Sequence, residues 1–159
     1  MREFDLYEPM RRWLQTYLED KYIGWEVITT IESNGMRLDR VLGKYGIIEV
    51  AAIGVEIQID VLGIVRKNGK HKLFFIEAKK TQLNLHHLGQ LWAYCKLIDP
   101  EEAFLMTPEG FGSLNKILCV LKREDLLDFG NGKVIKKMKI VRWNRRSNRP
   151  DQQTMIPKV

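Results

Sequence analysis

The stretch from Glu56 to Lys80 contains two runs of strand-forming residues on either side of a short polar turn sequence. The runs extend from Gln58 to Val65 and from Lys72 to Ala78, and Asn68-Gly69 lies between them. An Asn-Gly pair between two such runs is the strongest short-range signal for a β-hairpin, because both residues tolerate a positive φ. The sequence therefore predicts a hairpin closed by a two-residue loop.

The length of this loop also predicts which residues of the two strands face each other. With two loop residues, Asp60 lies opposite Glu77, and Gln58 lies opposite Lys79 on the same face of the sheet, since side chains repeat with period two. Because the turn sets this register, one residue inserted there should abolish any site that these side chains form while leaving much of the fold.

Asp60 and Glu77 would then form a pair of like charges, which destabilises a sheet when the residues are directly opposed. The other strand positions are apolar on both faces, as is typical of strands covered on both sides. One face carries Leu62, Ile64, Leu73 and Phe75, and the other carries Ile59, Val61, Phe74 and Ile76. Two half-buried carboxylates either share a proton or bind a cation, and Mg²⁺ prefers such oxygens. We therefore predict a metal site; a surface salt-bridge cluster at a strand end is the alternative.

The composition is that of an ordinary globular protein. The 159 residues are 45% hydrophobic and 29% charged, which fits a single domain with one core. No apolar run of about 18 residues and no signal region is present, so we expect a cytoplasmic chain that does not enter a membrane. Cys95 and Cys119 lack metal-binding spacing and are expected in the core. The net charge of +6 favours a polyanionic partner.

The N-terminal residues Asp5 to Asp20 have the periodicity of an amphipathic helix. Tyr7, Leu14 and Leu18 form its apolar stripe, flanked by Met10 and Phe4, and Pro9 must lie in the first turn or so. Glu8 falls near the edge of this stripe. It either leans toward the neighbouring sheet or closes a capping box with Asp5.

The following segment, up to Glu56, is less regular. Trp25 to Ile31 predicts a strand that ends at a Ser-Asn-Gly turn, and Met36 to Lys44 can form a short helix. Ile47 to Ile53 fits either a helix or a strand. Glu49 and Glu56 lie in this region and compete with Glu8 as a further acidic ligand.

After the hairpin, Asn84 can cap a helix that extends to Ile98, where Pro100 stops it. Its apolar stripe consists of Leu88, Leu91, Cys95 and Ile98. His86, Gln90 and Tyr94 follow one another at one-turn intervals, so this polar row could face the hairpin site. A solvated face is the alternative. Ala103 to Met106 predicts a buried strand, and a later helix is expected to stop at Gly130.

The C-terminal segment is strongly basic. Between Asp128 and Asp151 there is no acid, and the basic residues are Lys133, Lys136, Lys137, Lys139, Arg142, Arg145, Arg146 and Arg149. Val134 to Trp143 predicts a terminal strand, followed by a flexible basic tail from residue 144 to 159. Clustered basic residues suit phosphate contacts, and Trp143 offers a stacking surface. The alternative is an edge strand whose lysines prevent aggregation.

These residues resemble the signature of the PD-(D/E)XK nuclease superfamily. Asp60 is followed by sixteen residues and then by Glu77-Ala78-Lys79, although Ile59 stands where the name has proline. Gln90 to Tyr94 is similar to the Gln-x-x-x-Tyr element of RecB-like and archaeal Holliday junction resolvase-like nucleases, and Glu8 matches the acid on their first helix. The resemblance covers roughly residues 5 to 107.

The resemblance implies an α/β restriction-endonuclease-like core, with a central mixed sheet flanked by helices in the order αβββαβ. It also implies a deoxyribonuclease in which Mg²⁺ or Mn²⁺ is bound by Asp60, Glu77, the Ala78 carbonyl and Glu8. Lys79 would activate the attacking water, and Gln90 and Tyr94 would position the phosphate. The expected DNA-binding residues are Lys80, His86, Lys136, Lys137, Lys139, Arg142, Arg145 and Arg146.

A second hypothesis is a nucleic-acid-binding or assembly module that has this fold and does not cleave. A nucleotide-dependent enzyme is disfavoured, because the sequence has no Gly-rich phosphate-binding loop. The sequence leaves open the geometry of the DNA substrate and whether the protein forms a homodimer.

Overall fold

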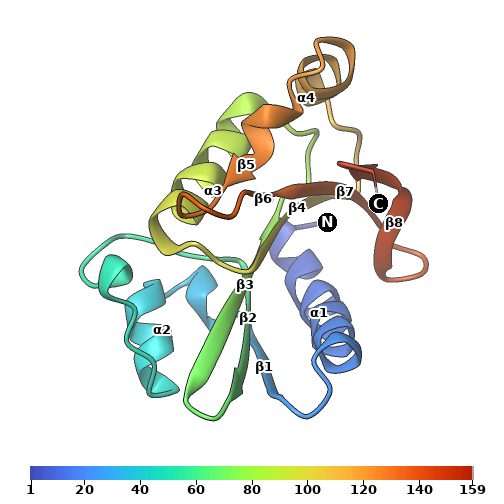
Figure 1. The fold of residues 1–159 in the computed structure, drawn as a ribbon. Coiled ribbons are helices and arrows are strands. Elements are labelled where there is room, and N and C mark those ends of the chain that lie inside the picture. Colours follow the sequence, from blue (N-terminus) through green and yellow to red (C-terminus); the bar gives the residue numbers. More distant parts are fainter. Residues whose placement is uncertain (159) are drawn as a thin grey trace.

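A mixed six-stranded sheet forms the centre of the computed structural model, which describes residues 1–158 (Figure 1). The strand order is β1-β2-β3-β4-β7-β8. Its strands are β1 (Glu26–Thr30), β2 (Val61–Lys67), β3 (Lys70–Ala78), β4 (Glu102–Thr107), β7 (Lys139–Asn144) and β8 (Arg149–Ile156). The helices are α1 (Tyr7–Lys21), α2 (Leu38–Lys44), α3 (Leu85–Ile98) and α4 (Ser113–Asn115), and β5 (Asp128–Phe129) and β6 (Lys136–Lys137) form a separate two-stranded sheet.

Helices cover both faces of the large sheet. The α1 helix lies on one face and α2 and α3 lie on the other (Figure 1). The first three strands form an antiparallel meander, whereas β3, β4 and β7 are parallel and β8 is antiparallel to β7. The chain is therefore an α/β protein with a mixed sheet flanked by helices, as predicted.

The hairpin is confirmed, with the predicted register. Asn68 and Gly69 have φ values of 53° and 77°, and the pairing extends from Lys67 opposite Lys70 to Val61 opposite Ile76. The strand β2 is shorter than predicted, because it begins at Val61 and not at Gln58.

Gln58 is consequently exposed and does not face Lys79. The backbone N–H of Lys79 instead donates to the carbonyl of Met106, at 2.9 Å. Beyond Ala78, the chain is therefore held by β4 and no longer by β2.

The sheet separates two hydrophobic clusters. On the α1 face, Leu14 and Leu18 pack with alternate residues of the strands, including Val61, Phe74 and Ile76. On the α3 face, the cluster includes Leu62, Ile64, Leu73, Phe75, Leu91 and Cys95. The assignment of Ile59 to the α1 face is wrong: it belongs to the cluster on the α3 face, because the regular alternation of β2 starts only at Val61.

The first helix has the predicted buried stripe, but its beginning differs from the prediction. A 3₁₀ helix, Glu3–Leu6, precedes α1. At its start, the Asp5 carboxylate accepts from the backbone N–H of Arg2, at 2.9 Å, and the Asp5 N–H donates to the carbonyl of Arg2, at 3.0 Å. Glu8 therefore does not form the capping box expected with Asp5. Phe4 is half exposed, so it does not join the buried stripe.

The irregular region after β1 contains the predicted short helix, α2. Within the stretch from Ile47 to Ile53, only Val50–Ala52 is regular, as a single turn of 3₁₀ helix. Later in the chain, α4 continues into a π-helical segment, Lys116–Val120, so the helix expected before Gly130 is short and irregular. Cys119 lies in this segment and is exposed, contrary to the prediction, whereas Cys95 is buried.

The C-terminal segment is ordered. The prediction of a flexible tail from residue 144 is wrong for the residues that the structure describes, because Arg149–Ile156 pair with β7 as strand β8; Val159 lies outside them. Trp143 is 2% exposed and packs in the cluster on the α1 face, so it cannot offer a stacking surface. Lys139, the one lysine of β7, does not lie on an edge strand either, because β8 forms that edge.

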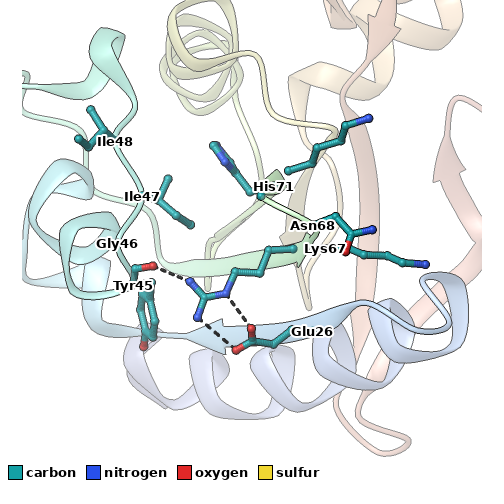
Figure 2. Close-up of a pocket in the computed structure, with 11 residues that line it drawn as sticks. Glu26, Tyr45, Gly46, Ile47, Ile48, Lys67, Asn68 and His71 are labelled. Carbon is teal, nitrogen blue, oxygen red and sulfur yellow. Dashed lines mark hydrogen bonds and ion pairs between the residues drawn. The ribbon is translucent and has the colours of Figure 1, made fainter.

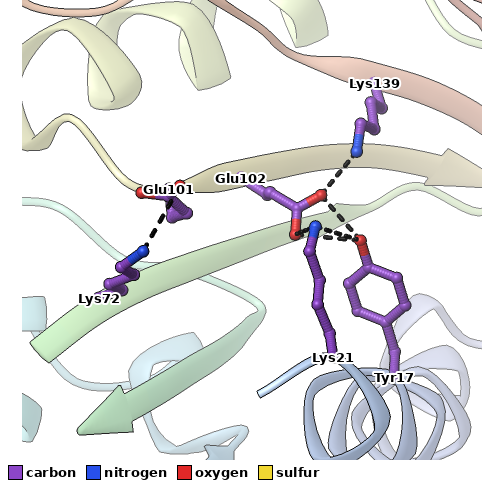
Figure 3. A network of polar contacts seen from close by, with 6 residues as sticks. All are labelled: Tyr17, Lys21, Lys72, Glu101, Glu102 and Lys139. Atoms are coloured by element: carbon purple, nitrogen blue, oxygen red, sulfur yellow. Dashed lines mark hydrogen bonds and ion pairs between the residues drawn. The ribbon is translucent and has the colours of Figure 1, made fainter. Parts of the chain in front are cut away.

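A buried ionic network ties α1 to β4 and β7 (Figure 3). The Glu102 carboxylate accepts from the Tyr17 hydroxyl at 2.8 Å, from Lys139 at 2.6 Å and from Lys21 at 3.2 Å. Burial alone would raise the pKa of Glu102, but these partners, Lys139 foremost, hold it below its ordinary value.

No helix among residues 1–158 combines the length and the apolar character that crossing a membrane requires.

Candidate active site

The carboxyl groups of Asp60 and Glu77 come together at the end of the β2–β3 hairpin. Asp60 lies one residue before β2, where its Oδ2 accepts a hydrogen bond of 2.9 Å from the backbone N–H of Ala78. This bond continues the hairpin alignment by one residue and fixes the Asp60 carboxylate beside β3. Glu77 lies within side-chain hydrogen-bonding reach of it.

Glu77 is an acid in an unfavourable position for a negative charge. It is 5% exposed, and among residues 1–158 its carboxyl group has no hydrogen-bonding side-chain partner other than Asp60. Burial raises the pKa of Glu77 strongly, and the neighbouring Asp60 raises it further, whereas Lys79 opposes both effects. In the absence of a cation, the pair therefore retains a proton.

Lys79 is the cationic group closest to this pair in sequence, and it lies on the same side of the sheet. Its side chain is half buried. It also acts on His87, in the first turn of α3: burial lowers the pKa of His87, and the positive charges of Lys79 and His86 lower it further. The start of α3 therefore lies next to the hairpin site.

The sequence interpretation missed two residues of the site, Tyr7 and Glu3. Burial raises the pKa of the Tyr7 hydroxyl, and the negative charges of Asp60 and Glu3 raise it further. Glu3 also raises the pKa of Glu77, and its Oε1 accepts from the backbone N–H of Lys80 at 3.1 Å. Both residues belong to the first two turns of the chain, and Tyr7 was recognised only as an apolar helix position.

Glu8 has other partners. Its carboxylate is bound by Arg11, at 2.9 and 3.1 Å from Nε, and lies 3.4 Å from Arg12. The hydrogen bond from Arg11 holds the pKa of Glu8 below its ordinary range, and the same guanidinium donates to Thr29 of β1. Nothing brings Glu8 to Asp60 or Glu77 among the described residues. The N-terminal acid whose charge acts on Glu77 is Glu3.

The remaining polar predictions lie along α3 and in the loop after α2. The Gln90 amide donates to the Tyr94 hydroxyl at 3.3 Å, so these two side chains form one polar pair, and His86 is exposed. The competing acids are not at the site: Glu49 lies 3.7 Å from His71, and Glu56 is exposed in a loop. Lys80 contributes its backbone N–H to Glu3, while its side chain is exposed.

The three predicted DNA-binding lysines of the C-terminal segment are engaged in ion pairs. Lys136 binds Asp99 at 2.9 Å, Lys137 binds Asp128 at 2.5 Å, and Lys139 binds Glu102. Their charges are therefore neutralised by acids from distant parts of the chain. Arg142, Arg145 and Arg146 are exposed and form no such pairs among residues 1–158.

A separate cleft of about 450 Å³ lies at the turn end of the hairpin (Figure 2). Its arginine, Arg66, is bound by Glu26 at 2.8 Å and by the carbonyl of Tyr45. This cleft is at the opposite end of β2 and β3 from Asp60 and Glu77, so it is not part of the candidate site.

The donor set fits a divalent metal ion of the Mg²⁺ or Mn²⁺ type. Two carboxylates and the carbonyl of Ala78 offer the oxygen ligands that such ions prefer, and a cation would remove the electrostatic cost of burying Glu77. Within residues 1–158, no group of three or more acidic, histidine or cysteine side chains is close enough to hold a metal ion. Water or a substrate oxygen would have to complete the coordination.

Comparison of the chain with protein-family models, with curated proteins and with solved structures finds no significant match. The resemblance to the nuclease superfamily thus rests on the residues of this chain alone.

Proposed function

We propose that the protein is a metal-dependent nuclease that hydrolyses DNA phosphodiester bonds, with a restriction-endonuclease-like core. The observation that carries the proposal is the alignment of Asp60 with Glu77 at the end of the hairpin, with Lys79 two residues further along the chain. Buried paired acids next to a lysine are costly for folding, and metal-assisted hydrolysis is a chemistry that needs this arrangement.

Each of these residues has a defined part in the proposed reaction. Asp60 and Glu77, with the Ala78 carbonyl, would hold Mg²⁺ or Mn²⁺, and the Ala78 N–H fixes the orientation of the Asp60 carboxylate. Such an ion polarises the phosphate and lowers the pKa of a bound water. The Lys79 ammonium orients the attacking water and stabilises the negative charge that develops on the phosphate. Gln90 and Tyr94 are proposed to position the phosphate from α3.

The second candidate function is a nucleic-acid-binding module without activity. It is favoured by one observation, that only two carboxylates and not three converge among the described residues. The two functions differ in a simple assay, because only the nuclease converts its substrate.

The test uses plasmid, single-stranded and branched DNA with Mg²⁺, Mn²⁺ or EDTA. We expect cleavage that EDTA abolishes and that Asp60→Asn and Lys79→Ala each reduce at least roughly 100-fold. Glu56→Gln is the matched control, because Glu56 is an exposed acid four residues before Asp60. Calorimetric titration with Mn²⁺ separates the roles: Asp60→Asn should weaken metal binding, whereas Lys79→Ala should retain it. Cleavage that persists in EDTA or in both variants would contradict the proposal, and binding without cleavage would favour the module.

A further inference from the structure

The basic C-terminal segment is divided into two chemically different halves. The charges of Lys136, Lys137 and Lys139 are neutralised by buried or half-buried acids. The guanidinium groups of Arg142 and of the following turn, in contrast, have no carboxylate partner among residues 1–158. The charge that remains available to a partner is therefore concentrated in the arginines.

Arg142, Arg145 and Arg146 line one open cleft of about 410 Å³. The Nε of Arg142 donates to the carbonyl of Pro108 at 3.1 Å, which fixes its guanidinium at the cleft. The turn after β7 is also held, because the Asn144 side chain accepts from the backbone N–H of Arg146 at 2.9 Å and of Ser147 at 3.2 Å. Arg142 thus projects from strand β7, and Arg145 and Arg146 project from an ordered turn.

The cleft is polar and has a net positive lining. Glu109 and Asp151 contribute carboxylates to it, but the three guanidinium groups outnumber them. Guanidinium groups present paired donors that match phosphate oxygens. Trp143 also borders the cleft, but its side chain is 2% exposed and leaves no surface on which a base could stack.

The register of the parallel strands relates this cleft to the candidate active site. Ala78 pairs with Met106, and Met106 pairs with Val141, so the next row contains Lys79, Thr107 and Arg142. Side chains in one row of a sheet point to the same face. Arg142 therefore lies level with Lys79, on the α3 face, two strands away.

Two other contacts place the N-terminal residues beside both the cleft and the site. Met1 lines the arginine cleft, and Glu3 accepts from the backbone N–H of Lys80 beside the site. Figure 1 shows the start of the chain next to the ends of β4 and β7. The N-terminal segment thus contacts the arginine cleft through Met1 and lies beside the acidic site through Glu3.

We propose that the arginine cleft binds the phosphate backbone of a polynucleotide, about three nucleotides from the phosphodiester that lies at Asp60 and Glu77. This proposal rests on the proposed nuclease function. Two strand spacings amount to roughly 10 Å, and a nucleic-acid strand rises about 3.4 Å per nucleotide. Because the cleft offers guanidinium groups and no exposed aromatic ring, it recognises the backbone and contributes no base preference.

The test measures binding of a fluorescent DNA of about 20 nucleotides by anisotropy in EDTA, so that no cleavage occurs. The variant Arg145→Ala/Arg146→Ala is compared with Lys67→Ala/Lys70→Ala, which removes the same charge at the far end of the β2–β3 hairpin. We expect the arginine variant to lose at least roughly 10-fold in affinity and the slope of log affinity against log salt to fall by about 2. The lysine control should change less than about 2-fold in the same assay.

The outcomes separate the two proposals. Equal losses of DNA affinity in the arginine and lysine variants would contradict binding at the cleft, because binding would then follow the net charge of the protein. This holds even if the protein cleaves DNA. If the arginine variant alone loses DNA affinity and the protein never cleaves DNA, the proposal of a DNA-binding cleft stands and the proposal of a nuclease is wrong. If inorganic phosphate displaces the DNA at concentrations comparable to those of competing oligonucleotide, the cleft is a small-anion site and the polynucleotide proposal is wrong.

Discussion

Replacing Gly63 by alanine should test how closely α1 packs on the sheet next to the candidate site. A Cβ at this position would lie 2.9 Å from Leu14 Cδ2, 2.9 Å from Leu18 Cδ1 and 3.2 Å from Phe74 Cβ. The two leucines are completely buried, so their methyl groups have no solvent-facing rotamer to move into. The helix must therefore shift away from β2.

The expected cost follows from overpacking. One methyl group inserted into a well-packed core typically costs about 1 to 3 kcal/mol, and the three close contacts place Gly63→Ala within that range. For a chain of this size, each kcal/mol lowers the melting temperature by roughly 2 to 4 °C. Gly89→Ala is the matched control, because Gly89 lies within α3, is exposed, and has open space where the alanine methyl group would stand, with no atom within 4 Å. It should stabilise the protein by roughly 0.5 to 1 kcal/mol.

Urea unfolding followed by far-UV circular dichroism gives both free energies of unfolding. The two identical substitutions should shift stability in opposite directions. If Gly63→Ala is as stable as the wild-type protein, then α1 does not pack on β2 as closely as described, and the placement of Tyr7 beside Asp60 loses its basis.

Three further predictions concern the ionic network, the acids of the site and the hairpin turn. Glu102→Gln should cost roughly 3 kcal/mol at neutral pH, because two lysines lose a buried partner. Since the pKa of Glu102 is lowered by folding, this stability difference should be complete above about pH 4.5 and shrink as the pH falls below it, which urea unfolding at several pH values will measure. Glu3→Gln should move the onset of Mn²⁺ binding to lower pH, because the charge of Glu3 raises the pKa of Glu77, whereas Glu8→Gln should not; identical onsets in calorimetric titrations would exclude Glu3 from the site. The expected effect of one glycine inserted in the β2–β3 turn changes with the structure, because β2 is also paired with β1 and β3 with β4, so the turn is not the only feature that holds the register. The insertion should therefore leave Mn²⁺ binding intact at a cost of about 1 kcal/mol, and loss of binding by a folded variant would show that the turn alone sets the register.

The parts of the fold that were predicted correctly are those determined by neighbouring residues. The Asn68-Gly69 turn needs two positive φ angles that few other residue pairs adopt, and Asn84 caps α3 through its own side chain, which accepts from the His87 N–H at 3.0 Å. Such local signals are complete within a few residues of sequence. They were sufficient to align Asp60 with Glu77.

The parts that were missed depend on distant partners. The segment Arg149–Ile156 is polar and contains Pro150, so its composition does not indicate a strand; it becomes one because β7 offers an unpaired edge. The lysines of the basic segment are neutralised by acids 9 to 37 residues away, and no periodicity reveals that. The partners of Glu8 could have been recognised, since Arg11 and Arg12 lie three and four residues later on the same helix.

The topology of the sheet also implies that the two halves of the proposed substrate surface form at different times during folding. The acids come from a hairpin, whose strands are adjacent in sequence, whereas the arginine cleft forms only when β7 docks parallel to β4 across the intervening 31 residues, 108–138. Closing a long connection before parallel pairing is a slow step relative to closing a short turn. We therefore expect amide hydrogen exchange during refolding to protect β2 and β3 before β7 and β8, so that the chain acquires its acidic pair before it can bind a polyanion at the arginines.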